Sequence, residues 1–325
     1  MKNIKYLITL LISLLLVPAG VLYAENIFIQ ADKQTFDGEK TTFEGKVKVN
    51  YSDITIKSPK AIVRNSKTGK PDAATFVDGA YALKESGYSR SEVKANIINL
   101  SLLKNRIRAE GNAESSVFEN KVPLVHIKAG SQSFDIKNNI IVAEENVSIK
   151  YKEILTDSDK ARITINDKGN LDKVELLGNV KVDQQKTIIK ANEIHYNPTT
   201  EEMVAPGNTS SESILEDGTY VIIYADFQQY DKATQILITS GNVKIKYKDY
   251  IATGPKANFI PDGGSSTPNK IVFLGRSRIQ EGQRYVEGDR LALTVNPKNF
   301  TAEGNVKTRF TDVADYKDKD KNKKL

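Results

Sequence analysis

The stretch Leu177-Gly-Asn-Val-Lys-Val182, followed by Ala191-Asn192, contains both halves of a unit that recurs along the chain. In the first half, Val180 and Val182 alternate with the charged Lys181. Successive side chains of a β-strand point to opposite faces, so this alternation predicts a strand with one apolar and one polar face. A sheet with one apolar face must bury it by folding over as a sandwich, a jelly roll or a barrel.

The glycine of this stretch, or a residue that replaces it, marks a repeat. Its positions are 45, 79, 111, 145, 178, 207, 241, 275 and 304, so the spacings are 34, 32, 34, 33, 29, 34, 34 and 29 residues. The second marker is an Ala followed by a polar residue, and the two markers interleave from Ala31 to Gly304. A period of this length is typical of repeat folds in which each unit contacts mainly its neighbours.

Short polar links separate the alternating segments. Asp183-Gln-Gln-Lys186 and Asn166-Asp-Lys-Gly169 are examples, and both have the composition of turns. Links this short join antiparallel strands, because parallel strands need long crossovers. We therefore predict two strands in each repeat and roughly 16–20 antiparallel strands in the chain.

The composition argues against an enzyme. The 325 residues include 0 Cys and 2 His, so disulfides, Cys/His zinc sites and thiol nucleophiles are excluded. His126 and His195 are isolated in the sequence, and we expect surface or structural roles for them. The chain has no Gly-rich phosphate loop and no Ser/His/Asp arrangement. We predict no catalytic residues, no metal site and no cofactor. The net charge of +6 is a mild bias towards anionic partners, and nucleic acid is not among those predicted.

The first 24 residues have the features of a secretory signal peptide. Lys2 and Lys5 precede an apolar run from Tyr6 to Val17, which is 12 residues long and shorter than the ~20 of a membrane-spanning helix. We predict cleavage after Ala24 and a mature protein that works outside the cytoplasm. The alternative is an uncleaved leader that anchors the chain. Beyond the leader we expect one repeat domain over 25–312 and a charged, disordered tail over 313–325.

The repeat resembles the LptA/OstA-like family, whose secreted members bridge the periplasm in lipopolysaccharide transport. The resemblance covers residues 25–310 and rests on both markers together. They are Ala31-Asp32 followed by Phe43-Glu-Gly45-Lys-Val47-Lys-Val49, Gly178-Asn-Val180-Lys-Val182 followed by Ala191-Asn192, and Gly241-Asn-Val243-Lys-Ile245 followed by Ala257-Asn258. It implies an all-β, elongated, open-ended, twisted β-jelly roll built from about nine ~33-residue, two-strand repeats.

The resemblance also implies a function without catalysis. We expect a periplasmic protein that binds and transports lipopolysaccharide or a related glycolipid between the inner and outer membranes and contributes to outer-membrane assembly. Its apolar interior would form a groove that shields the acyl chains. The candidates for this groove are Val47, Val49, Ile54, Ile56, Val147, Ile149, Val180, Val182, Ile188, Val243 and Ile245.

The two ends of such a sheet are candidate partner sites, because an unpaired strand edge is a template for another chain. The edge residues are Ile27, Phe28 and Ile29 at the first end, and Val306 and Phe310 at the last. The resemblance implies contact with an inner-membrane docking subunit at one end and an outer-membrane assembly protein at the other, both of the same fold. Head-to-tail self-association is a further expectation.

Three alternatives stay open at the level of sequence. A structural or adhesive surface protein would use the same repeat with a closed, dry core and no lipid ligand. An enzyme on a β-helix scaffold would need a cluster of acidic or basic side chains, which the repeats do not place. A retained leader would make the chain a membrane-tethered docking subunit of the same pathway. The sequence also leaves open the lipid head group, the strand register and the inward phase in the degenerate units.

Overall fold

The computed structural model describes residues 27–51, 54–86, 89–119, 122–135, 138, 140–151, 153–165, 171–215, 218–261, 268–294, 297 and 299–311. The predicted leader and the charged tail lie outside these residues. The chain divides into two compact units, Met1–Gly207 and Asn208–Leu325, and each is described by itself. The prediction of a single repeat domain over 25–312 stays a prediction. In the part of the chain that the structure describes, no helix is long and apolar enough to cross a membrane.

Every regular element of the described residues is a β-strand, and the pairings are antiparallel, as predicted. The strands of unit 1 are β1 (Ile27–Gln30), β2 (Lys33–Phe36), β3 (Lys40–Tyr51), β4 (Ile54–Asn65), β5 (Pro71–Val77), β6 (Ala80–Ser86), β7 (Ser89–Ala95), β8 (Ile97–Ser101), β9 (Arg106–Glu119), β10 (Val122–Asp135), β11 (Ile140–Tyr151), β12 (Ile154–Ile165), β13 (Leu171–Gln184) and β14 (Thr187–Asn197). The boundary between the units falls within β15 (Glu202–Ile214). Unit 2 continues with β16 (Tyr220–Asp231), β17 (Ile236–Tyr247), β18 (Tyr250–Pro261), β19 (Pro268–Glu281), β20 (Arg284–Thr294), β21 (Asn299–Glu303) and β22 (Lys307–Arg309).

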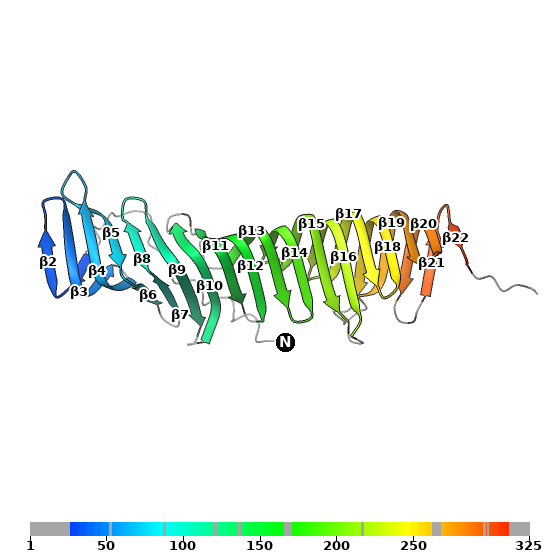
Figure 1. The fold of residues 1–325 in the computed structure, drawn as a ribbon, viewed down its shortest axis with the longest axis horizontal. Helices are drawn as coiled ribbons and strands as arrows, with labels where there is room; N and C mark the ends of the chain where they lie inside the picture. The colour runs from blue at the N-terminus through cyan, green and yellow to red at the C-terminus, as the bar shows by residue number, and fades with distance from the viewer. Residues whose placement is uncertain are drawn as a thin grey trace, which may run out of the picture. The chain divides into compact units, whose positions relative to one another are not determined.

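From β9 to β14, strands that follow one another in the chain lie side by side (Figure 1). The described residues contain 22 strands, but four full-length strands are interrupted at their middle, as β1/β2, β5/β6, β7/β8 and β21/β22. β4 shows why these are halves of one strand, because its first half pairs with β6 and its second half with β5. The strands therefore correspond to 18 full-length strands, two for each of nine repeats, within the predicted range.

The Gly-Asn marker is a corner at which the strand bends. In β13 the pairing register with β14 shifts between Leu177 and Val180. The two residues between them, Gly178 and Asn179, have positive φ values of 73° and 46°. This left-handed conformation is easy for Gly and tolerated by Asn, but it strains most other residues. Similar left-handed pairs occur at Gly45–Lys46, Asp78–Gly79, Gly111–Asn112, Glu145–Asn146, Gly207–Asn208, Gly241–Asn242 and Gly304–Asn305.

The polar residue of the second marker closes the corner of the next strand. Asp226 of β16 lies so close to Gly241 of β17 that a Cβ on this glycine would come within 2.5 Å of Asp226 Oδ2. The same oxygen accepts a 2.8 Å hydrogen bond from Asn242 Nδ2. We call this arrangement of carboxylate, glycine and asparagine the corner lock. It recurs with Asp159, Gly178 and Asn179, and with Asp289, Gly304 and Asn305.

In one degenerate repeat the glycine and the acidic side chain of the corner have exchanged strands. The corner of β11 has Glu145 where other repeats have glycine, and the neighbouring β10 has Gly130 after its marker Ala129. A Cβ on Gly130 would lie 2.7 Å from the Cβ of Glu145. Where the two strands approach this closely, as at Gly241 and Gly130, one residue without a side chain is required, and either strand can supply it.

Alternate side chains on both sides of each corner point inwards and form the core. Unit 1 contains two clusters of buried side chains, which include Val47 and Phe76 in the first and Val180 and Ile194 in the second. Unit 2 contains one, which includes Val243. Each cluster joins residues from both halves of the bent strands, so the halves face each other as the layers of a jelly roll.

Several marker alanines occupy the inside of the corner, where the two layers meet. The marker residue Ala161 pairs with Ala143 in the β11–β12 register, and both are 0% exposed. Ala61 and Ala257 are also 0% exposed at the equivalent places. Protein interiors are close-packed, so a larger side chain at this point would force the layers apart. This accounts for the small residue that begins the second marker.

The corner lock predicts different costs for two glycines with the same backbone. Gly241 and Gly207 both have φ of +72°, but a Cβ on Gly207 would meet nothing within 4 Å. Substitution by Ala costs about 1–2 kcal/mol at either site because of the left-handed backbone. Gly241→Ala must also displace Asp226, so we expect it to lower the free energy of unfolding by a further 1–3 kcal/mol or so. Urea denaturation of both variants measures this difference, and equal losses would contradict the corner lock.

Candidate functional site

Ten of the eleven predicted groove residues lie on the inner face. Of the eleven, nine are buried, with exposed fractions from 1% for Val47 to 9% for Val182. Ile54 is half-buried and packs against the first core cluster. The repeats therefore present a similar inner surface at β3, β11, β13 and β17. The nine buried residues are Val47, Val49, Ile56, Val147, Ile149, Val180, Val182, Val243 and Ile245.

The structure places Ile188 on the other face. β13 and β14 are joined by a two-residue turn, Gln185–Lys186, and their register pairs Asp183 with Ile188 and Val182 with Ile189. Directly paired residues in an antiparallel sheet share a face, so Ile188 lies with Asp183 and Ile189 with the inward Val182. Ile189 packs against the second core cluster. The sequence reasoning missed Ile189 as an inward residue. Counting residues outwards from the Gln185–Lys186 turn would have paired it with the inward Val182.

Partly exposed apolar side chains continue the inner face towards the ends of the strands. In the second cluster of unit 1 these are Ile141, Ile154, Val174, Ile189 and Met203. Each packs against buried residues nearer the corner and keeps part of its surface in solvent. An apolar ligand that approaches from the strand ends would meet these side chains before the buried ones.

Several inward positions are polar, and the sequence reasoning did not single them out. In unit 1, Gln132 is 7% exposed and accepts a 2.6 Å hydrogen bond from Ser115 Oγ through its Oε1. In unit 2, Thr209, Ser211 and Gln228 are 2%, 6% and 3% exposed. Among the described residues, Thr209 Oγ1, Ser211 Oγ and Gln228 Nε2 have no hydrogen-bond partner. These residues interrupt an otherwise apolar face.

The outer face carries ion pairs. Glu287 lies between Arg276 and Arg278, and its side chain is 16% exposed. Hydrogen bonding and charge from Arg278, followed by those from Arg276, hold the pKa of Glu287 below its ordinary value. The guanidinium carbon of Arg278 lies 4.4 Å from the centre of the Tyr285 ring, a cation–π contact. These partners give the cluster a structural role.

The two histidines pair with neighbouring polar groups. His126 Nδ1 lies 2.8 Å from Ser116 Oγ, and His195 Nε2 lies 2.7 Å from Glu193 Oε1. Of the residues that the structure describes, no group of three or more His, Cys, Asp or Glu side chains could hold a metal ion.

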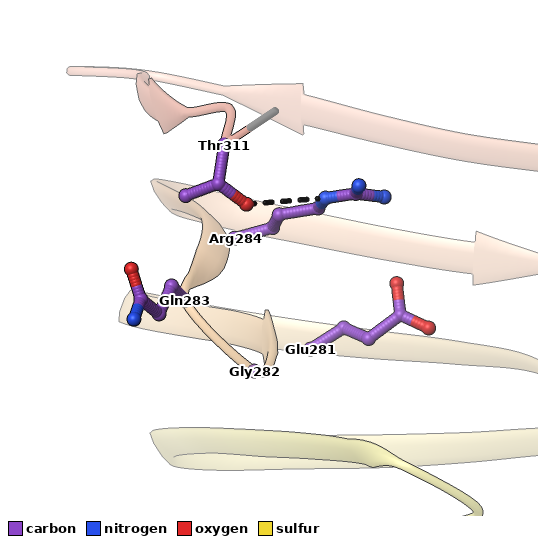
Figure 2. A pocket seen from close by; sticks show the side chains of 5 residues that line it. All are labelled: Glu281, Gly282, Gln283, Arg284 and Thr311. Atoms are coloured by element: carbon purple, nitrogen blue, oxygen red, sulfur yellow. Dashed lines mark hydrogen bonds between the residues drawn. The ribbon is translucent and has the colours of Figure 1, made fainter. Parts of the chain in front are cut away.

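A hollow of about 430 Å³ lies at the end of the β19–β20 hairpin. Figure 2 shows its five lining residues, and Arg284 Nε donates a 3.3 Å hydrogen bond to Thr311 Oγ1 beside it. None of these residues is buried, and the floor is the Gly282–Gln283 turn. The hollow is therefore a feature of the turn and offers no preorganised polar group.

Apolar residues are exposed on the first and last strands. β1 and β2 both pair with β3, and Ile27 and Ile29 share the inward face with residues of β3. Phe28 on the other face is 65% exposed. In unit 2, β21 and β22 pair with β20, and Val306 and Phe310 are 48% and 75% exposed. Within the described residues, the strands at both edges pair on one side only, and exposed apolar side chains lie on or beside these strands.

Comparison with known proteins places these features in a family. A family model described as "LptA/(LptD N-terminal domain) LPS transport protein" matches residues 28–122 and 126–219, together more than half of the chain. The crystal structure of LptH from Pseudomonas aeruginosa, described as the LptA homologous periplasmic component of the lipopolysaccharide transport device, is 15% identical. The alignment covers 39% of this chain and 96% of that one, with a TM-score of 0.35. A search of curated protein sequences found no match.

The lowered pKa of Glu287 predicts a pH-dependent contribution to stability. The ion pairs stabilise the fold fully at pH values above 4.5, the ordinary pKa of a Glu side chain. This stabilisation is lost as the pH falls through the lower pKa of Glu287 in the folded state. Glu287→Gln should therefore lower the urea midpoint at pH 7, and the difference from the wild type should shrink towards pH 3. Glu39→Gln is the control, because among the described residues Glu39 makes no ion pair. A difference that stays constant with pH would contradict this role.

Proposed function

Because the chain belongs to the LptA and LptD N-terminal-domain family of lipopolysaccharide transport proteins, we propose that it binds lipopolysaccharide or a related glycolipid and carries it through the periplasm. The acyl chains lie against the inner face of the bent strands. The observation that carries the proposal is the recurrence of inward Val and Ile at equivalent places, such as Val47, Val147, Val180 and Val243.

The energetics of an acyl chain explain why such a face is needed. Each CH₂ exposed to water costs ~0.8 kcal/mol, so a chain of about twelve carbons costs roughly 10 kcal/mol. A lipid with several chains therefore needs an apolar cover along its whole route. Since successive repeats present much the same inward side chains, movement from one repeat to the next has a small net cost. This supports transport along the repeats over storage at one site.

The lipid must enter between the layers, because the inward Val and Ile side chains pack against each other. The half-buried residues near the strand ends, such as Ile189 and Val174, provide the entry surface. The head group, with its sugars and phosphates, would remain outside, where Lys and Arg side chains can form charge-assisted hydrogen bonds with phosphate.

The partners follow from the sheet edges. We propose that the edge at β1 and the edge at β22 pair with proteins of the same fold, an inner-membrane docking subunit and an outer-membrane assembly protein. An added strand would satisfy the free backbone groups of the edge, and the exposed Phe28 and Phe310 would lose contact with water. Head-to-tail pairing of two copies uses the same edges. We also propose periplasmic localisation after cleavage of the leader.

A second candidate function is a structural or adhesive repeat protein without a lipid ligand. The observation in its favour is the close packing of the inner face, where Val47 and Val243 are each 1% exposed. In that case the layers would never separate, and the inward residues would have no role beyond stability.

Two adjacent isoleucines provide a matched test of lipid binding. Ile188 and Ile189 lie on opposite faces of β14, and both are partly exposed. A photo-crosslinking amino acid placed at either position in living cells would be probed for attached lipopolysaccharide after irradiation. We expect attachment at position 189 at least about tenfold above that at 188. Equal attachment, or none at 189 despite normal expression, would favour the structural protein.

The C-terminal edge predicts a partner-binding variant. Phe310→Asp places a charge on the edge, and we expect the amount of partner crosslinked in cells to fall about tenfold, which corresponds to ~1.4 kcal/mol. Leu103→Asp is the control, because Leu103 is 76% exposed and Phe310 75%, but Leu103 lies in the turn between β8 and β9. A similar loss for both variants would show that the edge is not the partner site.

A further inference from the structure

Unit 2 begins with a polar interruption of the inner face. After the corner, β11, β13 and β17 carry two inward Val or Ile residues, whereas β15 carries Thr209 and Ser211. The inward residue just after the β16 corner, Gln228, is also polar and buried. We call Thr209, Ser211 and Gln228 the polar step.

All three residues of the polar step contain buried atoms without a partner. Thr209 Oγ1, Ser211 Oγ and Gln228 Nε2 make no hydrogen bond within the described chain. Native proteins pair nearly all of their buried polar groups, because an unpaired donor or acceptor loses its bonds to water without replacement. Three such groups on two successive strands therefore point to a partner that binds there.

Unit 1 contains the same side chains in a paired arrangement. Ser211 and Gln228 each lie 96 residues after Ser115 and Gln132 in the sequence. Ser115 donates to Gln132, which in turn donates through Nε2 to two backbone carbonyl oxygens at 2.9 and 3.1 Å. The same pair of side chains is thus hydrogen-bonded within unit 1, whereas in unit 2 Ser211 Oγ and Gln228 Nε2 have no partner among the described residues.

Space is present beside the open arrangement. A hollow of about 300 Å³ is lined by the inward residues Thr209 and Ala225 together with Tyr224 and polar residues of the corners. Thr209 is the one residue of the polar step that lines this hollow, and it is 2% exposed. A small polar group of a ligand in the hollow would therefore lie beside Thr209.

The chemistry of the three groups selects the ligand atom. The amide of Gln228 offers N–H donors, and the hydroxyls of Thr209 and Ser211 can each donate one hydrogen bond. Their complement is an acceptor oxygen, which a hydrocarbon chain lacks. In an acylated lipid the carbonyl oxygen of the ester or amide linkage is the polar atom nearest to the chain, so it enters an apolar interior together with the chain.

We propose that the polar step binds the carbonyl oxygen of an acyl linkage in a lipid whose chain lies on the inner face. This inference rests on the proposed function and adds a position at which an acylated lipid is held. The inward Val and Ile side chains of other repeats offer hydrocarbon contacts alone, so the donors of the polar step would distinguish lipids with acyl linkages from simple alkyl amphiphiles.

Two amphiphiles that differ by one carbonyl oxygen test the proposal. Calorimetric titration of the full chain would compare 1-dodecanoylglycerol with 1-O-dodecylglycerol, both below their critical micelle concentrations. We expect the wild type to bind the ester about tenfold more tightly than the ether. Ser211→Ala/Gln228→Met should reduce this ratio to below about threefold and leave ether binding intact. Thr209→Val, which introduces the Val of other repeats, is the second variant and should reduce the ratio on its own.

Ser115→Ala/Gln132→Met is the matched control, because it makes the same changes where the groups are already paired. It should keep the tenfold ratio, although it breaks an internal network. Equal binding of ester and ether by the wild type, or an unchanged ratio in both unit 2 variants, would overturn the polar step and leave the proposed function standing. Failure of the wild type to bind either amphiphile would overturn both.

Discussion

The fold depends on the corner lock, because this contact converts a straight amphipathic strand into two halves that face each other. A carboxylate such as that of Asp226 occupies the space that a side chain at Gly241 would need and fixes the following Asn242 by a hydrogen bond. Without the bend, the alternating Val and Ile side chains would remain on an open sheet face in water. The lock therefore determines which residues are inside, and everything proposed about function concerns that inside face.

The two faces have separate tasks. The outer face carries ion pairs, such as those of Glu287 with Arg276 and Arg278. The inner face is apolar from repeat to repeat, which suits a ligand that has no fixed position along it. Polar inward residues break this uniformity: Gln132 is closed by internal hydrogen bonds, whereas Gln228 is left open. In the proposed function, a lipid would move along the repeating apolar positions and would be held differently where unpaired polar side chains face inwards.

Much of this architecture could be predicted from the sequence, because both markers are local and recur. The alternation around Val180 indicated the strand and its inward side, and the spacing indicated two strands for each repeat. The role of the markers could not be predicted, since Asp226 and Gly241 meet only after β16 and β17 pair. Ile188 was assigned to the wrong face because the register depends on the length of the turn.

The degenerate repeats and the polar inward positions were harder to predict, because they too depend on contacts between strands. Glu145 departs from the glycine marker, and its compensation by Gly130 is a contact between strands. At Gly275 the neighbour is Pro255, which no marker indicates. Thr is common in strands, but its strand propensity depends on its surroundings, so the burial of Thr209 could not be predicted from local sequence.

The central claim is that an acyl chain occupies the inner face that the corner locks create. It is tested most directly by nuclear Overhauser effects between the methylene protons of a bound lipid and methyl-labelled Val and Ile side chains of the full protein. The account predicts contacts to the methyl groups of Val147, Val180 and Val243 and none to the outward Ile188. Contacts to Ile188 alone, or to no labelled methyl group at saturating lipid, would contradict it.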